Sequence, residues 1–259
     1  MVIEYIEKSW AVYRRNFWPI VTAVLLQFLI VFIPAIIGIV PWIFVFLAFK
    51  GTSITTLLLS NLWLLCFSAV MIIISVLLSV ALNGGFVRML YESFRGKTRY
   101  ETMIETAKKK FWTIIGANSL VVLVLLSIII AIFLPLVLIL KGFFPTMVSS
   151  TTSLPLLITV ISIVGLGTIL LVLVSIFFTF VNQAIVIDNF NAIPAINRSF
   201  EVSKKCYLTI LGLMFIFILI NSALSTIFSI IGSALEWFVT MPLLLLSYIS
   251  LYLEKSRKK

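Results

Sequence analysis

The chain has 259 residues, of which 62% are hydrophobic and only 11% are charged, with nineteen basic and nine acidic side chains. Soluble domains are about one quarter charged, so this chain has too few charges to cover its apolar surface. The composition excludes a soluble globule, a disordered chain and a secreted disulfide-rich scaffold. It predicts a membrane protein with several spans.

Long intervals without Asp, Glu, Lys or Arg divide the chain into six parts. A helix that crosses a bilayer needs about 20 apolar residues, and each interval has room for one such helix. A β-barrel is excluded because its strands alternate polar and apolar residues, whereas the run 121–126 is apolar throughout. We therefore expect an all-α, polytopic transmembrane helix bundle that forms a single membrane domain over residues 1–259. The six expected spans lie near residues 18–39, 57–83, 112–138, 156–186, 208–230 and 237–253.

Two of the expected outer connections are unusually apolar. Residues 41–49 follow a span that is already complete, and residues 136–140 continue the third span in the same way. These segments either prolong kinked spans past Pro34 and Pro135 or lie in the outer leaflet, and the role of 41–49 stays open. They are too short for an additional crossing.

The basic residues fall almost entirely on one side of the expected membrane. Seventeen of the nineteen lie before, between or after the spans on that side, and only Lys50 and Lys141 lie on the other. The positive-inside rule places the seventeen in the cytoplasm, so both termini and a basic tail over 254–259 are expected inside a multi-pass cell-membrane protein. Anionic lipid headgroups are the expected partners; nucleic acid is not, because the chain has no motif for it.

A similar segment precedes spans one, three and five. Each has a pair of basic residues, then an aromatic residue, then a span, and Phe17, Phe111 and Tyr207 are 94 and 96 residues apart. The spacing predicts three parallel repeats near 1–83, 95–186 and 191–253, although bases and aromatics also occur at any inner membrane boundary. The basic pairs are candidate headgroup contacts: Arg14, Arg15, Lys109, Lys110, Lys204 and Lys205.

An amphipathic stretch lies upstream of each basic pair. The apolar residues of the first stretch recur at helical spacing: Ile3, Ile6, Trp10, Tyr13 and Phe17. Helices of this kind lie in the membrane surface, with aromatic side chains at headgroup depth. We expect each repeat to begin with such an interfacial helix, with Trp10, Met103 and Phe200 on the apolar faces, and then to bend into the bilayer at its aromatic residue.

The segment before span five resembles a signature of a loose group of membrane proteins. Residues 195–204 read Ala-Ile-Asn-Arg-Ser-Phe-Glu-Val-Ser-Lys, and a similar Arg-Ser-aromatic segment joins two spans in that group. The group includes the membrane domain attached to some glycerophosphodiester phosphodiesterases and related prokaryotic six-helix membrane proteins of unknown function. Residues 6–10 match in part, whereas 106–107 depart from the pattern. The resemblance implies a fold and not an activity, because this sequence lacks the soluble phosphodiesterase domain.

The side chains that most often act in catalysis are scarce in this chain. The chain has no histidine, which removes the most common general base and metal ligand. Its two cysteines, Cys66 and Cys206, are expected in different parts of the membrane and are interpreted as packing residues, with Cys206 open to thiol reagents from the inner side. The sequence contains no phosphate-binding loop, dinucleotide fingerprint, nucleophile elbow or zinc-protease motif. We expect a protein that is not an enzyme and has no cofactor or metal.

The polar residues within the expected spans are amides and hydroxyls. Interhelical hydrogen bonds, at roughly 1 kcal/mol each, explain them more simply than a polar substrate path does. Glu236 is expected at the outer edge of the sixth span, solvated or paired with Lys50 or Lys141, and its role stays open. The candidate intramembrane polar residues are Gln27, Asn118, Asn182, Gln183 and Asn221.

Two functions fit this pattern. The first is a non-catalytic integral membrane protein that organises lipid or a partner protein, which the uncharged spans and the three basic surface helices favour. The second is a transporter or permease component for a lipid-like or uncharged solute, which the repeats and the prolines beside spans favour. A lipid-modifying enzyme is a third reading with less support. A polar crevice at the deep asparagines would favour transport, and a dry core would favour the first reading.

Overall fold

The computed structural model describes residues 2–49, 60–96, 98–147, 153–228 and 230–257, and every regular element among them is helical. This confirms the all-α class for the described residues. In chain order the elements are α1 (Val2–Arg15), α2 (Phe17–Ala48), α4 (Leu62–Ser93), α5 (Tyr100–Lys109), α6 (Phe111–Met147), α7 (Ser153–Ser175), η1 (Ile176–Phe178), α8 (Val181–Val186), α9 (Ala192–Phe228), α10 (Ile230–Leu235), η2 (Glu236–Thr240) and α11 (Met241–Arg257).

Six helical segments of the described chain are long and apolar enough to cross a membrane, as predicted. They are Phe17–Ala48, Leu62–Ser93, Phe111–Leu134, Ile161–Val186, Ala192–Ile227 and Gly232–Ser256. The first span passes through Pro34 and Pro41, so residues 41–48 prolong it and do not form a separate segment. Helix α6 likewise continues past Pro135. Prolines are tolerated here because neighbouring groups can satisfy the backbone in membrane helices.

Two spans are less regular than predicted. Helix α7 gives way to the 3-10 turn η1 and then to α8, so the fourth span is broken over residues 176–180. The sixth span contains the π-helical turn η2 between α10 and α11. Helix α11 ends at Arg257, so the predicted tail over 254–259 begins as helix, and Lys258 and Lys259 lie outside the described residues.

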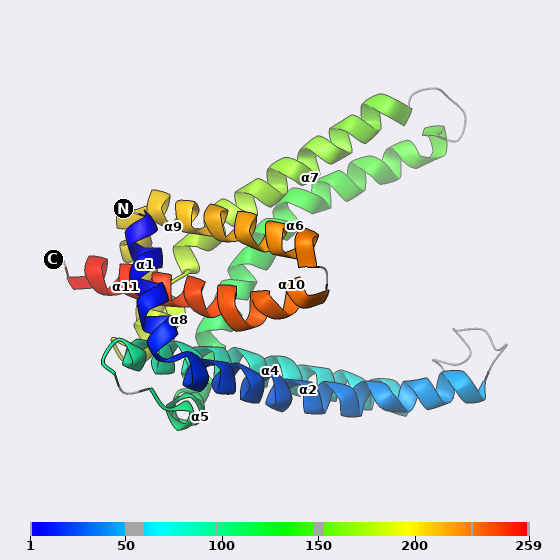
Figure 1. Ribbon diagram of the computed structural model, residues 1–259. Helices are drawn as coiled ribbons and strands as arrows, with labels where there is room; N and C mark the ends of the chain where they lie inside the picture. Colours follow the sequence, from blue (N-terminus) through cyan, green and yellow to red (C-terminus); the bar gives the residue numbers. More distant parts are fainter. Residues whose placement is uncertain (1, 50–59, 97, 148–152, 229, 258–259) are drawn as a thin grey trace.

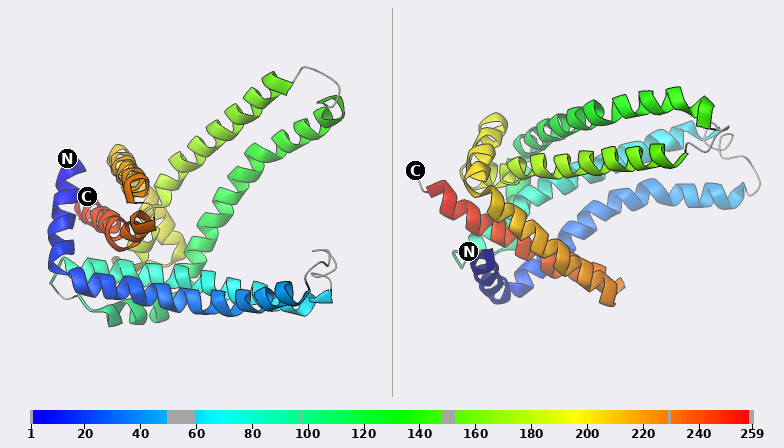
Figure 2. Two further views of the ribbon diagram at one scale, coloured as in Figure 1. Left: turned by 45° about the vertical axis from the view of Figure 1, so that its right-hand side comes forward. Right: turned by 90° about the horizontal axis from the view of Figure 1, so that it is seen from above.

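The spans form three hairpins: α2 with α4, α6 with α7, and α9 with α10 and α11 (Figure 1). The hairpins lie together at the end that holds both termini and separate toward the other end (Figures 1 and 2). Helix α1 lies across this end and not along the spans, and α5 packs on α4 at the same end. We call this region the charged end; it comprises α1, α5, the first part of α9 (192–205) and the last turns of α11.

The chain leaves helical geometry at three places where a surface helix meets a span. The residues are Asn16 (φ −115°, ψ 27°), Lys110 (φ −108°, ψ 12°) and Cys206 (φ −136°, ψ 24°). Each stands one residue before the aromatic residue at which a bend was predicted. At the first bend, Pro19 has no N–H to donate to the carbonyl of Arg15, which removes one helical hydrogen bond. The third bend divides α9 into two helical parts that meet at Cys206 (Figure 2).

Helix α1 packs on the rest of the protein through a face other than its most apolar one. Ile3 and Trp10, on the apolar face expected to lie against the membrane, are 65% and 47% exposed. The buried residues are Tyr5, Ser9 and Tyr13. Their hydroxyl groups find polar partners on other elements, which an apolar periodicity does not reveal. The stripe of Ile3 and Trp10 is left to face the surroundings of the protein.

The core lies at the charged end, where each surface helix packs on the second helix of a hairpin. Helix α1 packs on α11, α5 packs on α4, and the first part of α9 packs on η1 and α8. The contact between α4 and α5 is very close, because a Cβ added to Gly85 would lie 2.1 Å from the carbonyl oxygen of Met103. Of the residues expected on the apolar faces, Met103 is buried in this contact, whereas Phe200 is exposed and packs on Phe177.

Candidate functional site at the charged end

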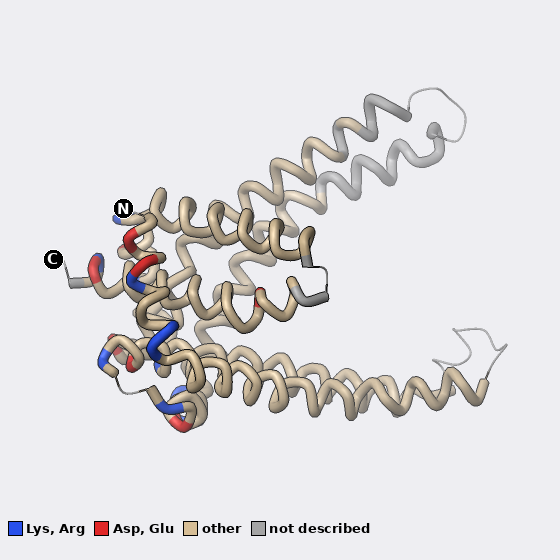
Figure 3. Tube along the Cα trace, viewed as in Figure 1, with Lys and Arg blue, Asp and Glu red and all other residues tan. Residues whose placement is uncertain are grey.

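The described charged side chains gather at the charged end (Figure 3). They lie on α1, on α5 and the adjoining end of α4, on and before the first part of α9, and on the last turns of α11. Among the side chains that the structure describes, Glu236 is the exception. Lys50 and the side chain of Lys141, the two bases expected on the opposite side, lie outside the described parts.

Two of the six candidate headgroup residues hold the fold together. The guanidinium of Arg15 donates a hydrogen bond to the carbonyl oxygen of Ser93, at 2.9 Å, and thereby ties the end of α1 to the end of α4. The ammonium of Lys110 donates to the side-chain oxygen of Asn189, in the loop before α9. These two bases are therefore less available to lipid than their sequence positions suggested.

The other candidate bases lie at the surface. Arg14 is exposed at the end of α1. Lys109 lies 3.8 Å from the carboxylate of Glu105, and both side chains are largely exposed, so that ion pair contributes little. The ammonium of Lys204 lies 4.3 Å from the centre of the Phe200 ring. Lys205 follows in the same last turn before the bend. Exposed bases of this kind can approach lipid phosphates.

The signature over 195–204 has a structural role at the break in the fourth span. The buried hydroxyl of Ser199 donates to the carbonyl of Phe177 at 2.7 Å and accepts from the backbone N–H of Phe180 at 3.1 Å. The buried hydroxyl of Ser203 donates to the carbonyl of Ile176 at 3.1 Å. Backbone groups that lose helical partners at η1 are thus satisfied by serines of α9, as a buried break requires.

Arg198 of the same signature joins three parts of the charged end. It donates a hydrogen bond to the carbonyl of Ser256 at 2.9 Å, and its Nε lies 3.8 Å from the carboxylate of Asp188. That carboxylate also accepts a hydrogen bond from the hydroxyl of Tyr252, at 2.5 Å. The cluster connects the loop before α9, the surface part of α9 and the end of α11, and sequence reasoning missed both Asp188 and Tyr252 as partners.

Helix α1 is held on η2 and α11 by hydroxyl groups. Tyr5 donates to the carboxylate of Glu254 at 2.8 Å, Tyr13 donates to the carbonyl of Phe238 at 2.8 Å, and Ser247 donates to Ser9 at 3.1 Å. Burial raises the pKa of Tyr5 and of Tyr13, and for Tyr5 the hydrogen bond to the carboxylate raises it further. Both phenols therefore remain protonated donors at neutral pH.

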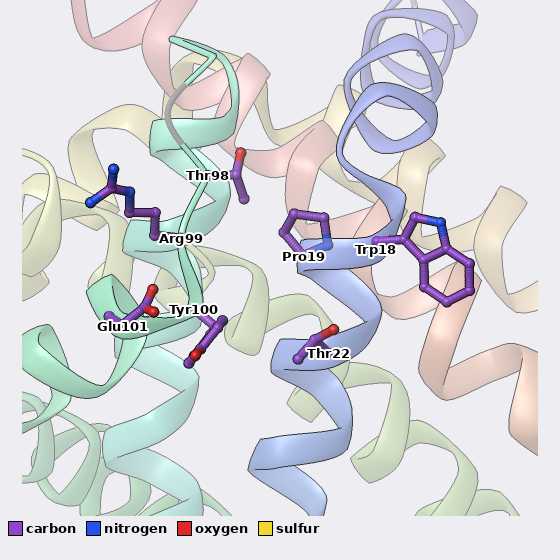
Figure 4. A pocket seen from close by; sticks show the side chains of 7 residues that line it. All are labelled: Trp18, Pro19, Thr22, Thr98, Arg99, Tyr100 and Glu101. Carbon is purple, nitrogen blue, oxygen red and sulfur yellow. The ribbon is translucent and has the colours of Figure 1, made fainter.

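A groove of about 430 Å³ lies between the start of α2 and the segment that leads into α5. Trp18, Pro19 and Thr22 form one wall. Residues 98–101 form the other wall, and Figure 4 shows that the Arg99 side chain extends away from the gap. The lining holds the hydroxyls of Thr22, Thr98 and Tyr100, two aromatic rings and the carboxylate of Glu101, and the guanidinium of Arg99 lies outside the gap. Hydroxyls, guanidinium groups and aromatic rings are groups that contact phospholipid headgroups.

The five deep amides do not converge on one path. Asn118 donates to the side-chain oxygen of Asn182 at 3.0 Å, between α6 and α8, as expected for an interhelical bond. Gln183 is buried beside this pair and its side-chain oxygen has no hydrogen-bond donor. Gln27 is half-buried on α2. Asn221, on α9, donates instead to the carboxylate of Glu236 at 3.2 Å, a partner that the sequence did not indicate.

The two cysteines differ from their predicted surroundings. Cys66 is exposed on α4, so the packing interpretation is wrong for it. Cys206 is buried, and its thiol donates to the carbonyl of Val202 at 3.1 Å, so it is not open to a reagent from the inner side. In the described part of the chain, no three His, Cys, Asp or Glu residues lie together as metal ligands would.

The model of one protein family, a domain of unknown function (DUF7847), matches residues 36–253. The chain belongs to the DUF7847 family. The matched region begins within α2 and ends within α11, so it includes the signature over 195–204, while α1 lies outside it. No curated protein and no solved structure matches the chain.

Proposed function

We propose that this DUF7847 protein is a non-catalytic membrane scaffold that organises anionic phospholipid around a cytoplasmic charged end. The observation that carries the proposal is the combination of exposed bases and exposed tryptophans at that end. Trp18 and Trp112 directly follow two of the bends and are 74% and 81% exposed. Tryptophan prefers the membrane interface, so this position supports bends at headgroup depth.

The exposed bases supply the attraction. A Lys or Arg near an anionic membrane surface contributes about 1 kcal/mol, so Arg14, Lys109 and Lys204 together contribute up to about 3 kcal/mol. The groove beside Trp18 and Arg99 offers one place for a headgroup, with an acyl chain along the exposed apolar face of α2. A cytoplasmic location follows from the positive-inside rule, because the surface helices and both termini share one end.

Three parallel repeats are part of the proposal. The bends at Asn16, Lys110 and Cys206 fall at matching places, 94 and 96 residues apart. Ile20, Ile114 and Ile210 are fully buried at the same interval, and so are Ser9, Met103 and Ser199. Each surface helix also packs on a second span, in a cyclic order closed by α1 on α11. These regularities support repeats of one surface helix plus two spans.

The resemblance to the membrane domain attached to some glycerophosphodiester phosphodiesterases supports a common architecture. Of the residues that match the signature, Ser199 and Ser203 bond the backbone at the break in the fourth span, and Arg198 bonds the end of α11. A structural role for the signature agrees with a scaffold, and it supplies no chemistry for an enzyme.

The alternative, a transporter for a lipid-like or uncharged solute, has less support. Asn118 bonds Asn182 between α6 and α8, Asn221 bonds Glu236 elsewhere in the fold, and the described groove lies at the charged end and not among these residues. The Asn118–Asn182 pair satisfies its own hydrogen bond and does not need a solute.

Lipid retention tests the scaffold proposal. The purified protein would be released from micelles containing equal amounts of phosphatidylglycerol and phosphatidylcholine and studied by native mass spectrometry. We expect preferential retention of phosphatidylglycerol, reduced about tenfold to a hundredfold in the triple variant Arg14→Gln, Lys109→Gln, Lys204→Gln. The matched control Arg14→Lys, Lys109→Arg, Lys204→Arg keeps every charge and should retain the lipid. Equal retention of both lipids by the wild type would contradict the proposal.

A further inference from the structure

Glu236 is the only charged residue between Lys205 and Glu254. It opens the π-helical turn η2 inside the segment Gly232–Ser256, which is one of the candidate spans. The side chain is half-buried, and its described partner is the amide of Asn221, 3.2 Å away on α9. A carboxylate inside a span is costly, so residues of this kind usually serve a function.

Residue positions place this pair inside the bilayer. Asn221 follows the bend at Cys206 by fifteen residues, which corresponds to about 22 Å along the helix. The hydrocarbon core of a bilayer is about 30 Å thick, so a helix that enters at Tyr207 still holds Asn221 within it. Figure 1 shows that the α9–α10 hairpin also ends short of the other two hairpins. With α9 entering the bilayer at Tyr207, Glu236 lies within the hydrocarbon layer, deeper than the outer edge at which the sequence placed it.

One oxygen atom of the pair lacks a described donor. The amide nitrogen of Asn221 is used by the Glu236 carboxylate, and the amide oxygen of Asn221 is buried with no hydrogen-bond donor. Turning the amide by 180° would bring this oxygen against the carboxylate, an arrangement that is unfavourable in the empty site and becomes favourable when a cation lies between the two oxygens. The site thus has one negative charge and a neighbouring oxygen acceptor, with no Lys or Arg on α10, on η2 or on the part of α9 beyond the bend.

The wide turn of η2 changes the backbone beside the carboxylate. The hydroxyl of Thr240 donates to the carbonyl of Glu236 at 2.9 Å, and Tyr13 of α1 donates to the carbonyl of Phe238. Single π-helical turns often occur at functional sites. Among the described hydrogen bonds that reach this turn from other elements, the bond from Tyr13 is the one made by a titratable side chain to the backbone. The turn is therefore held in place from the charged end.

We propose that Glu236 and Asn221 form an intramembrane binding site for a monovalent metal cation, Na⁺. Carboxylate and amide oxygens are ligands for hard cations. A single carboxylate balances a single positive charge, whereas a divalent ion would need further acids that the described surroundings of Glu236 lack. The bound cation neutralises the charge that this span carries into the hydrocarbon layer. This proposal does not depend on the lipid-binding function.

Thermal unfolding of the full chain in phosphatidylcholine nanodiscs tests the site. NaCl would be titrated against N-methylglucamine chloride at constant ionic strength. We expect Na⁺ to raise the Tm by about 5 °C at a hundredfold excess over its Kd. Glu236→Gln should abolish the Na⁺ dependence, and Asn221→Ala should weaken the apparent affinity about tenfold. Glu254→Gln, which removes a carboxylate at the charged end, should leave the Na⁺ dependence unchanged.

Glu236→Asp keeps the negative charge. It tests the site even if the other two variants fail to fold. It should fold and show a weaker Na⁺ dependence, because the carboxylate is drawn back from Asn221. The proposal is overturned if the wild-type Tm is the same in both salts, or if Glu236→Gln responds to Na⁺ as the wild type does. A Tm that changes with pH and not with Na⁺ would also overturn it, in favour of a proton.

Discussion

Tyr5 and Glu254, near opposite ends of the chain, are joined by a hydrogen bond of 2.8 Å from the phenol to the carboxylate. The contact holds α1 on α11 and so links the first surface helix to the last span. Helix α1 lies outside the region matched by the DUF7847 model. Glu254 follows the end of that region by one residue, so the bond joins two residues outside it and holds the N-terminal helix on α11, most of which is matched.

Replacing Tyr5 with Phe should lower the free energy of unfolding by about 2 kcal/mol, because a hydrogen bond to a charged group is lost. Denaturant unfolding in detergent would measure the change. Ile3→Ala on the exposed stripe is the control, and it should alter stability by less than about 0.5 kcal/mol. A Tyr5→Phe variant as stable as the wild type would show that the bond contributes nothing to docking.

Docking of α1 should also depend on pH in the alkaline range. The folded pKa values of Tyr5 and Tyr13 are raised, so their contribution is complete below the ordinary phenol value of 10.0 and is lost as the pH rises through the folded values. Limited proteolysis of α1 at increasing pH would detect the release. The double variant Tyr5→Phe, Tyr13→Phe should lose this pH dependence of cleavage.

Gly85 is required by the close contact between α4 and α5. Its replacement by Ala places a Cβ 2.1 Å from the Met103 carbonyl oxygen, so the helices must separate and stability should fall by about 2 to 3 kcal/mol. Gly116→Ala is a matched control, because nothing lies within 4 Å of a Cβ there. That control should be neutral or slightly stabilising, since Ala favours helix over Gly. Similar unfolding midpoints for the two variants would contradict the packing.

Ser199→Ala removes a buried hydroxyl that bonds two backbone groups at the break in the fourth span. We expect a loss of about 2 kcal/mol, because the carbonyl of Phe177 and the N–H of Phe180 are left without this partner. Ser225→Ala, at an exposed serine of α9, is the control and should have little effect. Hydrogen exchange at Phe180 should also accelerate in Ser199→Ala; unchanged exchange would argue against this role.

The two cysteines offer a test of burial. A lipid-soluble maleimide should label the exposed Cys66 much faster than the buried Cys206 in the folded protein. Both should react after unfolding, which serves as the control for reagent access. Faster labelling of Cys206 would mean that the bend in α9 opens in solution.

The spans and bends could be predicted because charge and apolarity alone determine which residues enter a bilayer. Long charge-free intervals marked the spans, and a basic pair before an aromatic residue marked the bends at Asn16, Lys110 and Cys206. These are local signals. Each is visible within about twenty residues of sequence, and none depends on which helix lies beside which.

The faces and the partners could not be predicted, since they depend on contacts between distant parts of the chain. In the sequence, Tyr5 and Ser9 lie on the less apolar side of α1. They are nevertheless buried, because their hydroxyl groups form hydrogen bonds with residues of α11. The break at η1 contains neither Pro nor Gly, and it is stabilised by Ser199 from the next span. Glu236 meets Asn221 only because the hairpin brings α9 and η2 together.

An electron cryo-microscopy structure in nanodiscs that contain phosphatidylglycerol would show whether the charged end organises anionic lipid. We expect ordered lipid phosphates beside the exposed bases Arg14, Lys109 and Lys204, at the level of Trp18 and Trp112, with acyl chains along the hairpins. Density for ordered lipid only at the opposite end, or a charged end that contacts no lipid phosphate, would contradict it.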